Sequence, residues 1–268
     1  MKNQPLVSVI IPCYNHGNYI MDAIVSVLNQ TYRNFEIIIV NDGSDDLITN
    51  DILAKINNSK IKVVYQSNSG PSVAKNFGIS ISKGDYILPL DCDNKLEKEF
   101  LEKSVDALQE NNADVVYTNY QHIGNKNDKY RSIEFNISKL LMFSFIENCS
   151  LYKKEVWIAN EGYDVFLSKK GIEDWEFWLN TAKHKFSFFH LDQFLFDYMV
   201  SDNSRTNKVA NKNLSETVNY IYNKHSDILA REFANLYHEN KNLKSTRDYK
   251  LGKAILWPLR MIKKLLHV

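Results

Sequence analysis

Cysteines, phosphate-binding glycine loops and long apolar runs are scarce or absent in this 268-residue sequence. The three cysteines, Cys13, Cys92 and Cys149, are odd in number and share no CxxC spacing, which argues against a disulfide framework or a zinc site and favours a reducing compartment. Neither GxGxxG nor a P-loop pattern occurs, which disfavours a Rossmann dehydrogenase and a P-loop protein. The N-terminal apolar run, Leu6 to Pro12, is shorter than a usual signal-peptide core. No stretch approaches the roughly 20 apolar residues that cross a bilayer, so we expect a cytoplasmic protein.

A surplus of positive charge is also lacking, because the formal net charge is only +1. Nucleic-acid-binding proteins need excess Lys and Arg to displace the counterions of phosphates, so we expect no nucleic-acid partner. The charge is unevenly distributed, since residues 241–268 hold eight Lys or Arg against one acid, Asp248. The composition is otherwise that of a folded protein with a substantial core.

Short β-branched runs alternate with helical patterns through the first 120 residues. We expect strands at five of these runs, over residues 7–11, 36–40, 61–65, 85–90 and 114–118. Apolar residues spaced near 3.6 predict helices between the strands, for example over residues 20–28 and 100–108. This alternation predicts an α/β fold with a mostly parallel central sheet flanked by helices.

Polar residues follow each of the first four predicted strands. Ligands bind outside the carboxyl ends of the strands in such sheets, so these residues are candidates for a binding site. They are Pro12-Cys13-Tyr14-Asn15, Asn41-Asp42-Gly43-Ser44, Gln66-Ser67-Asn68 and Asp91-Cys92-Asp93, in strand order.

The carboxylates of Asp91 and Asp93 stand two residues apart after an apolar strand. Oxygen ligands of this kind suit a hard divalent cation, Mn²⁺ or Mg²⁺, which can neutralise the charge of a diphosphate leaving group. Taken alone, such a triplet is more often a solvated turn or a helix cap. The motifs around this triplet favour the metal-binding interpretation over the solvated turn or helix cap.

Four stretches carry a family resemblance. They are VSVIIPCYN (7–15), SVLNQTYRNFEIIIVNDGSDD (26–46), NSGPSVAKNFGISISKGDYILPLDCD (68–93) and GIEDWEFWL (171–179). In order and spacing they resemble the family 2 type of inverting glycosyltransferases with the GT-A (Rossmann-like) fold. The resemblance implies transfer of a sugar from a nucleotide-diphosphate sugar, by expectation a UDP-sugar, to an acceptor hydroxyl. It also implies a part in cell-surface polysaccharide or glycolipid biosynthesis, with a glycan or lipid-linked glycan as acceptor.

Two residues would hold the nucleobase if the resemblance is followed. Tyr14 would stack on the base, and Asp42 would accept a hydrogen bond from it, as from uracil N3–H. The alternative for Tyr14 is a half-buried aromatic, and for Asp42 an Asx turn that caps the next helix. Pro12, Asn15 and Asn68 complete the nucleotide-side candidates.

The resemblance places the diphosphate near Lys75, which would act as a point charge; the alternative is a solvated lysine on a helix face. Asp93 would bind the metal directly, and Asp91 would bind the ribose or a metal-bound water. Cys92, also in the donor-binding motif, is expected as a small buried residue.

Glu173 and Asp174 resemble the family's catalytic pair of acids, about 80 residues beyond the metal motif. Inverting transfer needs a base on the face opposite the leaving diphosphate, and we assign it to Asp174, with Glu173 as neighbour or alternate. The alternative is a pair of acids favoured by the N-terminal dipole of a helix.

The sequence departs from the family at four places, one of which is Lys75, where the family often has Arg. Asn41 stands where many relatives have Asp, and Met199 and Ser201 occupy the places of an Arg and a His. Ser201, Asp202 or Arg205 are candidates to substitute for them. A catalytically decayed nucleotide-sugar-binding protein is therefore one alternative function. A sugar nucleotidyltransferase is another, although a Gly- and basic-rich loop after the first strand is missing.

The expected organisation is a GT-A domain over residues 1–207 and a helical C-terminal extension over 208–268. Within the first, residues 1–118 form the nucleotide-sugar-binding half and 119–207 the acceptor-side half. Residues 251–268 combine apolar and basic side chains, as does a helix attracted to an anionic membrane surface, which would make the protein peripheral on the inner face of the membrane. The rival interpretation is a helix docked on the protein's own body or in a homo-oligomer.

Overall fold

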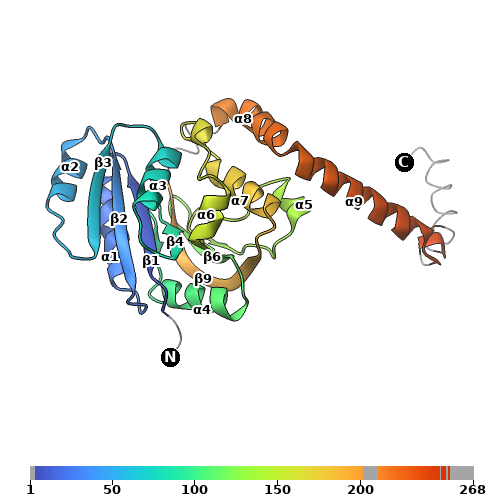
Figure 1. Ribbon diagram of the computed structural model, residues 1–268, viewed down its shortest axis with the longest axis horizontal. Coiled ribbons are helices and arrows are strands. Elements are labelled where there is room, and N and C mark those ends of the chain that lie inside the picture. The colour runs from blue at the N-terminus through green and yellow to red at the C-terminus, as the bar shows by residue number, and fades with distance from the viewer. Residues whose placement is uncertain (1–3, 202–210, 248, 252, 254–268) are drawn as a thin grey trace. The chain divides into compact units, whose positions relative to one another are not determined.

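The computed structural model describes residues 4–201, 211–247, 249–251 and 253 (Figure 1). The chain divides into two compact units, Met1–Ile221 and Tyr222–Val268. The predicted division at residue 207 stays a prediction. Most of residues 251–268 lie outside the described part, so the predicted basic tail does too.

Nine strands form one sheet within the described residues, in the order β3-β2-β1-β4-β8-β6-β9-β5, with β7 paired to β6. β1, β2, β3 and β4 run parallel, β8 is antiparallel to both β4 and β6, and β6 is parallel to β9. The strands are β1 (Val7–Cys13), β2 (Phe35–Asp42), β3 (Ile61–Gln66), β4 (Tyr86–Pro89), β5 (Lys95–Leu96), β6 (Val115–Gly124), β7 (Lys129–Tyr130), β8 (Leu151–Lys153) and β9 (Phe188–Val200). All five predicted strands are present.

Helices cover both faces of the sheet in the first unit. They are α1 (Gly17–Leu28), α2 (Leu47–Ala54), α3 (Pro71–Ser80), α4 (Phe100–Glu110), α5 (Ile137–Leu140), α6 (Lys154–Ala159), the 3-10 turn η1 (Val165–Leu167), α7 (Glu173–Lys183) and α8 (Asn211–Lys224). α8 ends just beyond the boundary between the units. The second unit contains α9 (Ser226–Ser245).

Successive side chains of β1 point to opposite faces of the sheet, and each face packs against different helices. Val7, Val9 and Ile11 belong to the core cluster that also holds the apolar residues of α1 and α4, so these helices pack on one face. Ile10 points to the other face, where α3 approaches so closely that a Cβ at Gly78 would lie 2.6 Å from Ile10 Cγ2. A sheet covered on both faces explains why β1 is a continuous apolar run.

The parallel arrangement brings the carboxyl ends of β1 to β4 to one edge of the sheet. The loops that follow these strands therefore lie next to one another. β4 separates this half of the sheet from β8, β6 and β9.

Candidate functional site

The loops after β1 and β2 are joined through Asn15. Its side-chain amide donates to Asp45 Oδ1 (2.6 Å), its side-chain oxygen accepts from the Asp45 N–H (3.0 Å), and its own N–H donates to Ser44 Oγ (3.0 Å). Pro12 is half-buried near the end of β1, and Tyr14 is 41% exposed. The ring of Tyr14 is therefore available to stack on a ligand at this edge.

Asp42 ties the loop after β2 to the loop after β3. Its Oδ1 accepts from Gln66 Nε2 (2.7 Å) and the Ser69 N–H (2.8 Å), and its Oδ2 accepts from the Gly70 N–H (2.8 Å). The carboxylate is buried. Since a carboxylate offers about four acceptor sites, one remains for a ligand donor.

The cap of α2 is Asp46, whose Oδ1 accepts from the Thr49 N–H (2.7 Å). The turn after β2 is closed by Asn41, whose side-chain oxygen accepts from the Ser44 N–H (2.9 Å). The alternative in which Asp42 caps the next helix is therefore wrong.

Gly43 and Asn68 show how closely the loops after β2 and β3 approach. Gly43 has a positive φ of 70°, and a Cβ there would lie 2.6 Å from the backbone nitrogen of Asn68. Asn68 is exposed, and its carbonyl oxygen accepts from Lys169 Nζ (3.1 Å). Asn68 thus stands at the open edge beside the loop that carries Asp42.

Asp91 and Asp93 follow β4, and both are half-buried. Burial and the nearby charge of Asp91 raise the pKa of Asp93 to about 6. A divalent cation would relieve this repulsion between two hard oxygen donors. Within the described residues no group of three or more His, Cys, Asp or Glu is arranged to hold a metal ion. Two carboxylates completed by phosphate oxygens of a substrate fit the usual way in which proteins hold Mg²⁺.

Cys92 is more deeply buried than its two neighbours. It is buried in the core cluster, and its Sγ lies 3.0 Å from Nδ1 of His16. Hydrogen bonding with Cys13 and burial raise the pKa of the Cys92 thiol well above its ordinary value. The side chain therefore fills space between the ends of β1 and β4, as the sequence predicts.

A path of hydrogen bonds runs from the loop after β4 to α7. Asp91 Oδ1 accepts from Asn148 Nδ2 (3.1 Å), and Asn148 Oδ1 accepts from Lys75 Nζ (3.1 Å), which also pairs with Glu173 Oε1 (3.2 Å). The ammonium group lies 4.5 Å from the centroid of the Tyr163 ring. Lys75 is only 1% exposed, so the alternative of a solvated helix-face lysine is wrong.

Asp174 is the second residue of α7 and is half-buried, with Oδ1 accepting from the Trp175 N–H (2.9 Å). The Trp175 indole donates to the Leu140 carbonyl (2.6 Å) and anchors this end of the helix. Burial and the adjacent Glu173 raise the pKa of Asp174 to about 6. Both acids stand in the first turn, where the helix dipole also favours them. Lys75 forms an ion pair with Glu173, and its charge also partly offsets the raised pKa of Asp174.

Glu147 is a third carboxyl group on this side of the site. Its Oε1 accepts from the Tyr120 hydroxyl (3.1 Å), and the residue is half-buried. Burial and the charges of Asp174 and Asp91 raise the pKa of Glu147 to about 8. It therefore holds its proton at neutral pH.

Tyr198 of β9 lies where the carboxyl groups converge. Burial and the charges of Glu147, Asp91, Asp174 and Asp93 all raise its pKa. The Tyr198 hydroxyl is thus close to all four carboxyl groups, which come from segments up to more than 80 positions apart. Each of the four residues is half-buried, so each keeps some surface exposed to solvent.

Sequence reasoning missed Glu147, Asn148, Tyr120 and Tyr198. The first two lie in the loop before β8, where no motif is recognisable. A buried polar pair, Glu147-Asn148, in an otherwise apolar segment was the one available signal.

The segment with Met199 and Ser201 is joined to the loop after β4, because the Met199 N–H donates to Asn94 Oδ1 (2.9 Å). Asp202 and Arg205, the other candidates to replace the missing Arg and His, lie outside the described residues.

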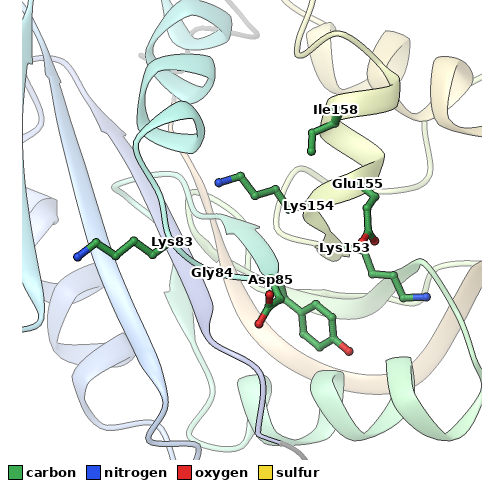
Figure 2. Close-up of a pocket in the computed structure, with 8 residues that line it drawn as sticks. Lys83, Gly84, Asp85, Lys153, Lys154, Glu155 and Ile158 are labelled. Carbon is green, nitrogen blue, oxygen red and sulfur yellow. The ribbon is translucent and has the colours of Figure 1, made fainter.

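A cavity of about 520 Å³ lies elsewhere, at the opposite edge of the sheet (Figure 2). It is lined by the start of β4 and the end of β8, where Tyr86 pairs with Lys153. Two of its three lysines already have partners, since Lys153 pairs with Asp114 (2.8 Å) and Lys154 Nζ donates to the Ser82 carbonyl (2.7 Å). None of the candidate site residues lines it.

Comparison with known proteins gives a family match. The model described as Glycosyl transferase family 2 matches residues 8–218. An uncharacterized glycosyltransferase of Rickettsia conorii is 35% identical over 195 residues, which are 66% of this chain and 31% of that protein. Glycosyltransferase GlyG of Streptococcus pneumoniae is 40% identical over 117 residues, 43% of this chain and 39% of that protein. This chain thus spans well under half the length of these relatives.

Solved structures match in fold. S. aureus TarS 1–349 in complex with UDP-GlcNAc gives a TM-score of 0.62 at 20% identity, covering 74% of this chain and 60% of that chain. The complex of the same protein with UDP gives 0.61 at 22% identity, covering 73% and 61%. These matches confirm the predicted GT-A class of fold, with a mostly parallel sheet flanked by helices and with C-terminal helices.

Proposed function

The chain belongs to glycosyl transferase family 2, and from this premise we propose that it transfers a sugar, with inversion, from a UDP-sugar to an acceptor hydroxyl. The observation that carries the proposal is the convergence of Asp91, Asp93 and Asp174 around Tyr198. Such a grouping supplies both charge for a metal-bound diphosphate and a carboxylate for the acceptor. A UDP donor is supported by the TarS structures, which hold UDP and UDP-GlcNAc.

The nucleoside would be held at the ends of β1 to β3. The exposed ring of Tyr14 stacks on the base, and the remaining acceptor site of Asp42 receives a donor of the base. Because Asp42 is fixed by three protein donors, it is oriented before the nucleotide arrives. Pro12, Asn15 and Asn68 shape the open edge around it.

Asp93 and Asp91 would hold a divalent cation, Mn²⁺ or Mg²⁺, together with the diphosphate. When bound, the cation supplies neutralisation of the charge that develops on the leaving diphosphate. Lys75 contributes to this part of the site in two ways. It donates to Asn148, which orients Asp91, and its positive charge lies beneath the site.

Asp174 would act as the base. Its carboxylate takes the proton of the acceptor hydroxyl as the hydroxyl oxygen forms a bond to the anomeric carbon. The bond from that carbon to the diphosphate oxygen breaks, and its electron pair leaves with the nucleoside diphosphate. Attack from the face opposite the leaving group inverts the configuration. Glu173 neutralises Lys75 and positions the start of α7.

UDP release tests this proposal. In the presence of Mn²⁺, and with water or an added glycoside taking the sugar, the wild type should release UDP from at least one UDP-sugar. Asp174→Asn should release it about 10²–10⁴ times more slowly while binding UDP normally, since that is the usual contribution of a general base. Glu155→Gln, at an exposed position of α6, is the matched control and should behave as the wild type.

The same assay separates the two alternatives. UDP binding without turnover across UDP-, GDP- and dTDP-sugars would indicate a decayed binding protein, as the Met199 and Ser201 replacements allow. Release of pyrophosphate instead of UDP would indicate a sugar nucleotidyltransferase. Either result would overturn the proposed transfer.

We further propose that the acceptor belongs to cell-surface polysaccharide or glycolipid biosynthesis and that residues 251–268 attach to anionic lipid. Four basic residues, Lys253, Arg260, Lys263 and Lys264, alternate there with apolar ones. Within the described residues, no helix has the length and apolar character needed to span a membrane.

A further inference from the structure

Three tyrosines from three strands surround Glu147. Tyr120 of β6 stacks on Tyr130 of β7, with ring centroids 4.8 Å apart, and lies 5.4 Å from Tyr198 of β9. Tyr120 is buried, whereas Tyr130 and Tyr198 are half-buried. The latter two rings therefore present apolar surface to solvent close to the carboxyl group.

Glu147 has hydrogen-bonding capacity to spare. Within the described residues its side chain is bonded to the Tyr120 hydroxyl, through Oε1. The charges that face it are Asp174 from α7 and Asp91 from the loop after β4, both negative, and the phenols of Tyr130 and Tyr198 also lie near. Its raised pKa keeps the group protonated at neutral pH, so Oε2 can donate a hydrogen bond to a ligand.

The sheet places this cluster on the far side of β4 from the nucleotide loops. Glu147 precedes β8, and Tyr120 and Tyr198 lie on β6 and β9, whereas Tyr14 and Asp42 end β1 and β2. Among the charged residues of the proposed site, Asp174 has the largest electrostatic effect on the pKa of Glu147. A molecule bound here would be next to the base and away from the nucleobase.

We propose that Glu147, Tyr130 and Tyr198 bind the acceptor, and that this acceptor is a neutral sugar ring. The inference rests on the proposed function and extends it to the substrate class. A pyranose has an apolar C–H face that packs on aromatic rings, and a rim of hydroxyls that a carboxyl group can bond. A phosphate or carboxylate acceptor would be repelled by the carboxylate of Asp174 beside Glu147.

Binding of simple glycosides tests the inference. A panel of 4-nitrophenyl pyranosides with gluco, galacto and 2-acetamido rings is titrated into protein saturated with UDP and Mg²⁺. We expect at least one glycoside to bind the wild type, and its affinity to fall about tenfold or more in Glu147→Ala and Tyr198→Ala, since a buried hydrogen bond and an aromatic contact are lost. Glu147→Gln keeps the size and a donor, so its affinity should stay within about threefold of the wild type.

The UDP affinity of every variant is the control for folding and should be unchanged. Glu155→Ala removes a carboxyl from the opposite edge and should not alter glycoside binding. Equal glycoside affinity in Glu147→Ala, Tyr198→Ala and wild type would overturn the inference, as would a UDP-loaded wild type that binds a serine peptide and no pyranoside. Failure of the wild type to bind UDP would instead overturn the proposed function, and this inference with it.

Discussion

Two adjacent carboxyl groups differ in their contact with a single lysine. Glu173 is buried against Lys75, while Asp174, the next residue, is half-buried and faces Asp91 and Glu147. An ion-paired carboxylate is a poor base, because its charge is already stabilised. The unpaired neighbour, whose pKa is raised, is better suited to accept a proton near neutral pH.

The pH dependence of transfer should show this. The pKa of Asp174 is raised to about 6, so below that pH the carboxyl is protonated and cannot act as a base. We expect the initial rate of UDP release to fall about tenfold per pH unit below about pH 6 and to level off above it. A rate that stays constant between about pH 5 and 7 would remove Asp174 from the base role.

A second change in the transfer rate, at alkaline pH, should come from Glu147, whose pKa is raised to about 8. Above that pH the group ionises, loses its donor and adds negative charge beside Asp174. The groups facing it are Asp174, Asp91, Tyr120, Tyr130 and Tyr198. Transfer should therefore decline above about pH 8 in the wild type and not in Glu147→Gln, because the amide does not titrate. An unchanged alkaline decline in Glu147→Gln would contradict this assignment.

At the scale of elements, the Lys75–Glu173 pair links α3 to α7, and Asn148 extends the link to the loop after β4. The pair is almost completely buried, with 2% and 4% of its side chains exposed. Breaking such a pair from one side leaves an uncompensated charge in the interior. The link thus couples the position of the loop after β4 to the start of α7.

Lys75→Met should destabilise the protein by about 3 kcal/mol, because Glu173 would remain charged and buried. The double variant Lys75→Met/Glu173→Gln should recover much of this loss, since no charge is left unpaired. Urea unfolding followed by circular dichroism gives both free energies of unfolding. If the single variant is no less stable than the double variant, the pair is not a buried ionic contact of this kind.

At the scale of the whole molecule, the order of elements followed from the sequence. The apolar runs that form β1 to β4 and β6 are continuous because both faces of the sheet are covered. Such runs can be recognised in the sequence alone. The loops after β1 to β4 were predicted as neighbours because the carboxyl ends of parallel strands meet at one edge of the sheet. The comparisons then confirmed the family and the GT-A fold.

The contacts between distant side chains could not be predicted in the same way. Nothing in the spacing of Lys75 indicates that Glu173, 98 residues later, is its partner. Likewise Glu147 meets Tyr120 only because β6 and β8 are adjacent, and the order of these strands is a tertiary property. The nucleotide half has local motifs at strand ends, whereas the other half is assembled from segments that carry no such signature.

Membrane attachment belongs to this scale as well. Removing Lys253 to Val268 deletes most of the basic, apolar tail and none of the candidate site residues. We expect the shortened chain to bind UDP as before and to lose binding to vesicles of phosphatidylglycerol, with neutral phosphatidylcholine vesicles as the control. Unchanged sedimentation with the anionic vesicles would refute the lipid role and favour docking against protein.

The most direct test of the shared site is the affinity for UDP, measured calorimetrically with and without Mn²⁺, in the wild type, Asp93→Ala and Asp174→Asn. The wild type and Asp174→Asn should bind UDP more tightly when Mn²⁺ is present, because Asp93 and the diphosphate hold the cation together, while Asp93→Ala should show no such gain. A metal-dependent gain in UDP affinity that persists in Asp93→Ala would contradict the assignment of the cation to the loop after β4. Loss of that gain in Asp174→Asn would contradict the assignment of the base to α7.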